Sequence, residues 1–414
     1  MKHLLSVSSA LFLATAFAGV PAIESIVSLQ GASGKLKVSY TLAGEPAIVT
    51  AEILVDGVSL GPITNFEGDV CRLLQPGDCK FFWDASAVPG VGTLPVGSTV
   101  VKLTAWPTNS PPDYIVAHLK QPYEVRYYPG AEWVPGGVTN ASCKTDYLVM
   151  RRIHAAGVTW LMGQSGETDA TRKIEHDPRM VTFSSDYYIG IYPVTQGQYE
   201  NIMGGNPSYY KTDSETYGNH RERPVEQVPW TYWRGSDHEW PQSGHTVDED
   251  HPLGYFRRYT GLEVDLPTSA QWEYACRAGT TTWWFDSTKT SAGDWICDYG
   301  WCNGNAASGT HPVGLKKQNP WGLYDLYGNV WEWCLDWYSA TSGFWKTAWN
   351  GGNALADPAG PADASDADKK RIRRGGDWSN DATACRSARY IGGKQTDGGV
   401  TAGARFVCPP MVTK

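Results

Sequence analysis

The sequence is short of positive charge. Its 414 residues carry 35 Lys and Arg against 43 Asp and Glu, a net charge of −8. Nucleic-acid binding needs a basic surface that neutralises phosphates, and no basic stripe runs along this chain. One basic run, KKRIRR at Lys369 to Arg374, is expected to form a solvated strand edge or turn. A nucleic-acid partner is therefore not predicted.

Several catalytic and metal-binding patterns are also missing. No G-x-S-x-G, no phosphate loop and no ordered Ser, His and Asp set stands out as an indication of nucleophilic catalysis. The cysteine spacings do not form CxxC pairs, so a zinc-thiolate site is not expected. A loose group of histidines in an acidic loop is interpreted as a solvated surface insertion, with a metal site as the alternative. These histidines are His220, His238, His245 and His251.

Long apolar runs are absent beyond the N-terminus. The stretch Leu4 to Ala18 is apolar, follows Lys2 and leads into small residues, which is typical of a secretory signal peptide cleaved near Ala18 or Ala22. The run is too short for a membrane anchor, and no later stretch has the ~18 apolar residues that a membrane span needs. The sequence therefore predicts a signal peptide over 1–22, a secreted or periplasmic protein, and no membrane span.

Export permits disulfide bonds among the nine cysteines. Cys71 and Cys79 flank a Pro-Gly-Asp turn, which indicates a hairpin closed by a disulfide. Cys297 and Cys302 form a second local candidate pair. An odd number of cysteines leaves at least one without an intramolecular partner. The sequence does not determine the pairing of Cys143, Cys334 and Cys408.

Residues 23–130 have the pattern of an all-β module. Polar and apolar residues alternate at the strand period, and clusters of Pro, Gly and Asn separate the runs. Such spacing over about a hundred residues is typical of an immunoglobulin-like sandwich. No cluster of His, Asp and Glu occurs here, so we predict a spacer or binding module, joined to the rest by a turn-rich linker over 131–144. The expected strands are 35–40, 47–55, 79–84, 98–106 and 123–128.

From residue 145 to residue 414 the pattern changes to a few short helices between loops rich in Trp, Gly and Asn. In the clearest helix, Thr268 and Gln271 form a capping box at the start, and Gly279 marks the end. We therefore expect an α+β domain with little regular secondary structure. Helices are predicted at 196–203 (capped by Thr195), 248–259 and 266–279.

Six motifs in this second region resemble those of the sulfatase-modifying-factor, or formylglycine-generating-enzyme, domain family, and they follow the family's order. The resemblance implies a variant of the C-type-lectin-like fold, which agrees with the α+β pattern. The motifs are VTWLMG at 158–163, YYIGIYPVTQ at 187–196, RPVEQVPW at 223–230, LPTSAQWEY at 266–274, GLYDLYGNVWEW at 322–333 and RGG at 374–376.

The chain departs from that family at its catalytic cysteines. In the enzymes, two cysteines after the Gly-Gly dipeptide bind copper(I) and exchange thiols with the substrate. The resemblance places Asn380 at the first position and leaves the second without a counterpart, and it implies that Cys385 forms a structural disulfide with Cys276. Copper is therefore not expected, and iron is not expected because no H-x3-H-x-E arrangement occurs.

The resemblance also implies a structural calcium ion. Its ligands would be the side chains of Asp325 and Glu332 and the carbonyls of Gly328 and Val330. Two carboxylates across a Gly-Asn turn offer the hard oxygens that calcium takes. In the alternative interpretation, Asp325 caps a turn and Glu332 pairs with an arginine.

The C-terminal loops carry residue types that bind ligands by stacking and hydrogen bonding, and the resemblance to lectin-like relatives implies a binding surface there. We therefore predict an exported, non-catalytic protein that binds a peptide, glycan or small molecule, or serves as a scaffold. The alternative is a metal- and oxygen-dependent oxidoreductase. Most of the 19 tryptophans are expected in the core. The candidate ligand-binding residues are Asp377, Trp378, Asn380, Asp381, Arg386, Arg389 and Tyr390.

Overall fold

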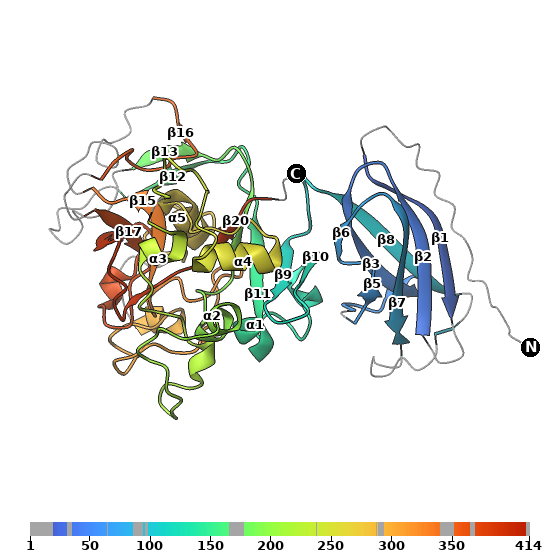
Figure 1. Cartoon of the computed structure of the whole chain (residues 1–414), viewed down its shortest axis with the longest axis horizontal. Coiled ribbons are helices and arrows are strands. Elements are labelled where there is room, and N and C mark those ends of the chain that lie inside the picture. Colours follow the sequence, from blue (N-terminus) through green and yellow to red (C-terminus); the bar gives the residue numbers. More distant parts are fainter. Residues whose placement is uncertain are drawn as a thin grey trace, which may run out of the picture. The chain divides into compact units, whose positions relative to one another are not determined.

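A computed structural model gives the fold of the chain (Figure 1). Contacts divide it into two compact units, which are described separately; one holds residues 1–116 and 125–138, the other 117–124 and 139–409. Among the described residues, no helix is long and apolar enough to cross a membrane. The predicted signal peptide lies almost wholly outside the described part of the chain. The structure describes residues 20–30, 35–63, 65–85, 94–95, 98–164, 178–236, 238–286, 288, 294–339, 352–364 and 369–410.

The N-terminal unit is an all-β region of antiparallel sheets, as predicted. One sheet has the order β1 (Ala22–Gln30), β2 (Lys35–Ala43), β7 (Gly77–Asp84), β5 (Glu67–Gly68). In the other, β3 (Ala47–Val55) pairs with β4 (Val58–Ser59), β6 (Arg72–Leu74) and β8 (Thr99–Pro107). Alternate residues of β2 are buried, among them Val38 and Tyr40, because successive side chains point to opposite faces of a strand.

The predicted hairpin between Cys71 and Cys79 is wrong. β6, which follows Cys71, pairs with β3, whereas β7, which contains Cys79, pairs with β2 and β5 in the other sheet. The Pro-Gly-Asp turn therefore connects two sheets rather than two partners of one ladder. The backbone N–H of Cys71 donates instead to the Val49 carbonyl, at 2.6 Å.

The larger unit contains three small sheets. Their orders are β11 (Tyr147–Ile153), β14 (Tyr187–Gly190), β20 (Val407–Cys408); β12 (Thr159–Met162), β13 (Arg179–Thr182), β16 (Leu355–Ala356); and β18 (Tyr390–Lys394), β17 (Lys370–Arg374), β15 (Trp331–Trp337), β19 (Ala402–Gly403). The β13–β16 and β15–β19 pairs are parallel. Two further strands, β9 (Tyr114–His118) and β10 (Glu124–Tyr128), span the division between the units.

Helices are few and short, in agreement with the predicted α+β class. The predicted capping box at Thr268 and Gln271 is present, and the predicted cap Thr195 also forms a capping box, with Gln198; in each, the Thr side chain accepts the Gln N–H and the Gln side chain bonds back to the cap. A side-chain cap stabilises a helix by about 1 kcal/mol. The helices are α1 (Ala141–Thr145), α2 (Gln196–Met203), α3 (Trp230–Arg234), α4 (Pro252–Thr260) and α5 (Ser269–Arg277), with 3-10 turns η2 (Ala131–Trp133), η4 (His220–Glu222), η5 (Asp294–Asp298) and η6 (Ala382–Ala384).

The core of this unit is rich in tryptophan, and one prediction about it is wrong. The basic run at 369–374 is not a solvated edge, because β17 lies between β15 and β18 and both Arg371 and Arg374 are fully buried. The Arg371 guanidinium lies 3.9 Å from the ring centroid of Trp230 and 3.1 Å from that of Trp337. Aromatic faces attract a desolvated guanidinium, so the basic run helps to build the core. The fully buried tryptophans here are Trp230, Trp233, Trp272, Trp284, Trp333 and Trp337.

Candidate functional site

The C-terminal loop between β17 and β18 starts at Gly375 and Gly376, whose backbone conformation requires glycine. Both residues have left-handed backbones, with φ of 99° at Gly375 and 83° at Gly376. A Cβ atom on Gly376 would lie 2.6 Å from the Cys385 sulfur. Because other residues rarely adopt this conformation and no space exists for a side chain, the pair fixes the direction of the loop.

The seven candidate ligand-binding residues of this loop fall into two groups by solvent exposure. Asp381 is exposed, and Trp378, Asn380 and Arg389 are half-buried. Asp377, Arg386 and Tyr390 are at most 3% exposed, so they contribute to the structure of the loop rather than to its surface. Asp377 Oδ1, for example, accepts hydrogen bonds from the backbone N–H and hydroxyl of Ser379, at 2.7 and 2.6 Å.

Trp378 is the aromatic centre of the surface group. Its ring lies edge-on to Tyr210, with 5.7 Å between the centroids. The buried Nε1 of Trp378 has no hydrogen-bond partner among the described residues. An indole N–H usually finds a partner when buried, so this donor is left unsatisfied by the described residues. Beside Tyr210, Tyr209 is 67% exposed.

Glu226 lies beneath this aromatic group, and sequence reasoning missed both Glu226 and Tyr210. Its Oε1 accepts the Tyr210 backbone N–H at 2.9 Å, and the residue is fully buried. Burial raises the pKa of Glu226 to about 7, although backbone N–H groups and the Arg223 guanidinium oppose the shift. The surface thus presents stacking faces, and directly beneath it lie a buried donor without a partner in the described part of the chain and a buried carboxyl with a raised pKa. Both residues are far from Trp378 in sequence, and only the RPVEQVPW motif drew attention to Glu226.

The two carboxylates predicted to bind calcium have protein partners of their own. Both oxygens of Glu332 are held by Arg405, with Nη2 at 2.8 Å from Oε1 and Nε at 2.9 Å from Oε2. Asp325 Oδ2 accepts the Gly314 N–H at 2.7 Å, and burial raises the pKa of Asp325 to about 6. This arrangement matches the alternative interpretation, a turn cap and an arginine pair. Gly328 and Val330 lie in the turn between them, where a Cβ on Gly328 would meet the Trp301 carbonyl at 1.9 Å.

A calcium ion would have to displace Arg405 from Glu332. The described side chains therefore do not fit a calcium ion in their present arrangement, and calcium binding stays a prediction.

Two cysteines lie next to the position where the related enzymes carry their first catalytic cysteine. The Cys297 and Cys302 sulfurs are 3.9 Å apart. The backbone N–H of the neighbouring Asn303 donates to the Asn380 carbonyl at 2.9 Å, which ties this segment to the C-terminal loop.

The other predicted pair shows no bridge in this structure. The Cys276 thiol donates to Ser387 Oγ at 3.5 Å, and the Cys385 sulfur lies 3.9 Å from the Asp381 carbonyl. The three predicted disulfides therefore stay predictions.

The histidines of the acidic loop are distributed over separate carboxylates. Their nearest Nδ1-to-carboxylate distances are 2.7 Å for His220 with Asp213, 2.8 Å for His245 with Asp265 and 3.3 Å for His251 with Asp248. No group of three or more His, Cys, Asp or Glu suited to a metal ion occurs in the described part of the chain. His245 differs from the others because it lines a cavity, together with Asp265.

Comparison with known proteins identifies the family of the larger unit. Residues 146–409 match the description "Sulfatase-modifying factor enzyme 1-like domain". The chain is 31% identical over 217 residues to a protein named Chaperone protein LppX from Paenibacillus barcinonensis, covering 44% of this chain and 74% of that protein. It is 27% identical over 274 residues to a formylglycine-generating enzyme from Thermomonospora curvata, covering 56% and 84%.

Solved structures of similar shape include Treponema denticola variable protein 1, with a TM-score of 0.49, 25% identity and coverage of 64% of this chain and 96% of that chain. PvdO from Pseudomonas aeruginosa gives a TM-score of 0.46 at 20% identity, over 63% and 94%.

Proposed function

The chain belongs to the sulfatase-modifying factor enzyme 1-like domain family, and from that premise we propose that it is a non-catalytic ligand-binding protein whose binding surface centres on Trp378. The proposal includes export, a C-type-lectin-like framework for the larger unit, and an immunoglobulin-like spacer for the N-terminal sheets. The related formylglycine-generating enzymes supply a fold, but a fold does not determine a reaction.

The observation that carries the proposal is the unused indole N–H of Trp378 beside the rings of Tyr210 and Tyr209. A ligand with an apolar face and a hydrogen-bond acceptor satisfies both features, since the face packs on the rings and the acceptor takes the N–H. A relative named as a chaperone supports a polypeptide as the class of ligand. A glycan would supply the same two features and is an outcome of the test.

The chemistry of position 380 supports binding rather than catalysis by the enzymes' route. An asparagine side chain offers an amide in place of a thiolate, so it neither binds copper(I) strongly nor exchanges with a disulfide.

The test is a peptide and glycan array probed with the full chain and two variants of one residue. Trp378→Ala removes the ring and the donor, and we expect at least a tenfold loss of affinity for the best ligand. Trp378→Phe keeps an aromatic ring beside Tyr210 but removes the N–H and the second ring of the indole, so its affinity should lie between those of the parent and Trp378→Ala. Tyr232→Ala, an aromatic that is 46% exposed on α3, is the matched control and should bind normally. An array without hits, or normal binding by Trp378→Ala, would contradict the proposal.

A metal- and oxygen-dependent oxidoreductase is the second candidate, and the thiol pair Cys297 and Cys302 beside Asn380 is the observation in its favour. A peptide containing CxPxR, incubated with the protein, copper and oxygen, distinguishes the two. Conversion of the peptide cysteine to formylglycine, detected by mass spectrometry, would establish the oxidoreductase; an unchanged cysteine supports binding.

A further inference from the structure

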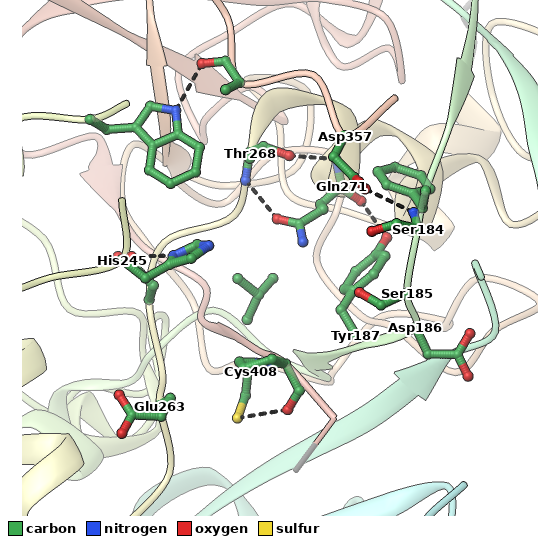
Figure 2. A pocket seen from close by; sticks show the side chains of 16 residues that line it. Ser184, Ser185, Asp186, Tyr187, His245, Glu263, Thr268, Gln271, Asp357 and Cys408 are labelled. Atoms are coloured by element: carbon green, nitrogen blue, oxygen red, sulfur yellow. Dashed lines mark hydrogen bonds and ion pairs between the residues drawn. The ribbon is translucent and has the colours of Figure 1, made fainter. Parts of the chain in front are cut away.

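A cavity of about 220 Å³ in the larger unit shares no residue with the C-terminal loop. Five stretches of the chain form its wall. They are residues 183–187 between β13 and β14, residues 240–245 before α4, residues 263–271 from the end of α4 into α5, residues 357–359 after β16, and residues 407–409 at β20. Figure 2 shows side chains from these segments around one space, with the carboxylates of Asp186 and Glu263 turned away from it. Because five separate stretches of sequence converge there, the cavity is a feature of the tertiary fold.

Aromatic rings form the apolar part of the wall, and hydrogen bonds fix two of them. Trp240 Nε1 donates to the Ala359 carbonyl at 2.8 Å, and the Tyr187 hydroxyl donates to the Gln271 carbonyl at 2.7 Å. Phe183 lies beside Tyr187, with 5.8 Å between the centroids. Since the polar ends of Trp240 and Tyr187 are used, their faces are left to contact an apolar group, and the rings need no ordering on binding.

The charge on the wall has one sign. Its residues include no Lys or Arg, but they include Asp186, Glu263, Asp265 and Asp357. Arginines outside the wall pair with three of them: Arg152 with Asp186, Arg257 with Glu263 and Arg234 with Asp265.

Asp357 has no cationic partner in the part of the chain that the structure describes; its Oδ1 accepts the Ser184 backbone N–H at 2.9 Å. The cavity therefore retains one unneutralised carboxylate, which disfavours an anion and attracts a cation.

His245 contributes an imidazole ring, with its two nitrogens, to the cavity wall. Its Nδ1 lies 2.8 Å from Asp265 Oδ2. Because a carboxylate can only accept, this contact places a proton on Nδ1, and in the neutral form of the ring Nε2 is then an acceptor. Figure 2 shows the second ring nitrogen of His245 turned toward the cavity, on the side away from Asp357. The Trp240 ring, 4.9 Å from that of His245, holds the imidazole from one side.

We propose that this cavity binds a small organic ammonium ion with an aromatic body. The ammonium group faces Asp357, the body lies against Trp240 and Tyr187, and a hydroxyl at the far end of the ligand donates to His245 Nε2. This site goes beyond the Trp378 surface, with which it shares no residue, so either site can fail its test without affecting the other.

Tyramine is the probe, because it carries an ammonium group, an aromatic ring and a phenol. Titration into the full chain, followed by calorimetry at fixed ionic strength, should give a Kd of about 0.1–10 mM, the range for a ligand of this size. Phenethylamine lacks only the hydroxyl and should bind more weakly. 3-(4-Hydroxyphenyl)propionate replaces the ammonium with a carboxylate and should not bind at the same concentrations.

Two variants separate the cavity from the general charge of the protein. Asp357→Asn keeps the acceptor for Ser184 N–H and removes the charge, so it should weaken tyramine about threefold to fivefold, the effect of one partly solvated ion pair. Glu249→Gln, at a carboxylate that is 92% exposed and outside the cavity wall, should leave the affinity unchanged. Equal binding of the propionate, no binding of tyramine, or an unchanged affinity in Asp357→Asn would overturn the proposal.

Discussion

Arg405 holds both carboxylate oxygens of Glu332 inside the larger unit, where the two residues are fully buried. The same guanidinium donates to the carbonyls of Gly190 and Tyr324, at 2.8 Å each. The pair thus links β14, β15 and the GLYDLY segment. A buried ion pair adds little net stability over apolar residues of similar shape, because its desolvation offsets its attraction, but removal of one partner leaves a buried charge uncompensated.

Replacement of Arg405 with Met should therefore lower the free energy of unfolding by about 3–5 kcal/mol. Urea denaturation followed by tryptophan fluorescence measures the change. Lys317→Met is the matched control, because it removes the cation of an exposed pair with Asp298 (65% and 56% exposed) and should leave the free energy of unfolding almost unchanged. Equal effects of the two substitutions would show that the Glu332 pair does not organise the core.

The same pair makes a prediction about calcium. Because Arg405 already occupies both oxygens of Glu332, we expect that removal of calcium with a chelator leaves the Tm unchanged. Thermal melts with excess calcium and with excess chelator test this, with magnesium as the control for ionic strength. A Tm that rises specifically with calcium, and rises further in Arg405→Met, would show that the ion and the arginine compete for one site.

The sequence predicted the features that depend on neighbouring residues. The capping box of Thr268 and Gln271 was identified because a cap and its Gln are three residues apart, and strands such as β2 were identified from the alternation of polar and apolar residues, whereas β1 was not predicted.

Features that depend on distant residues were missed. Arg371 looked exposed because its neighbours in sequence are basic, whereas its position is set by Trp230 and Trp337 from other elements. Likewise, no local pattern links Trp378 to Tyr210, or His245 to Asp265. Such contacts follow from packing rather than from propensity, and the resemblance to a family gave the order of motifs but not these pairs.

The stability of the fold should depend on pH through Glu226. The pKa of this carboxyl is about 7 in the folded protein, against an ordinary value of 4.5. Between these values the folded state holds a proton that the unfolded state has lost, so stability falls as pH rises from about 4.5 to 7. In Glu226→Gln this dependence disappears, and the variant should gain up to about 3 kcal/mol relative to the parent between pH 5 and pH 8.

The readout for Glu226 is the difference between parent and variant, because Asp336 and Asp325 also have raised pKa values, of about 7 and 6, from burial. Their contributions are common to both proteins and cancel. Urea denaturation at four pH values gives the difference directly. A constant gap across this range would mean that Glu226 titrates normally in the folded protein.

Oxidation should join Cys297 and Cys302. Their sulfurs are 3.9 Å apart, and a disulfide requires about 2.05 Å, so a rotation of one side chain is enough to form the bond. Treatment with oxidised glutathione should give an intramolecular bridge between these two residues, with loss of both thiol hydrogens to the oxidant. Peptide mapping by mass spectrometry identifies the bridge. Cys276 is the internal control, because burial raises its pKa to about 12 and keeps it in the unreactive thiol form.

The bridge should also affect the Trp378 surface, since Asn303 donates to the Asn380 carbonyl directly after Cys302. The covalent bond restrains the backbone around Cys302, and the hydrogen bond from Asn303 couples this restraint to the loop that carries Trp378. Oxidised protein should therefore differ from reduced protein in its affinity for the ligand found on the array, whereas Cys302→Ser should bind equally well before and after oxidation. If the two thiols stay separately alkylatable after oxidation, or the affinity does not change, the pair is structural and has no influence on binding.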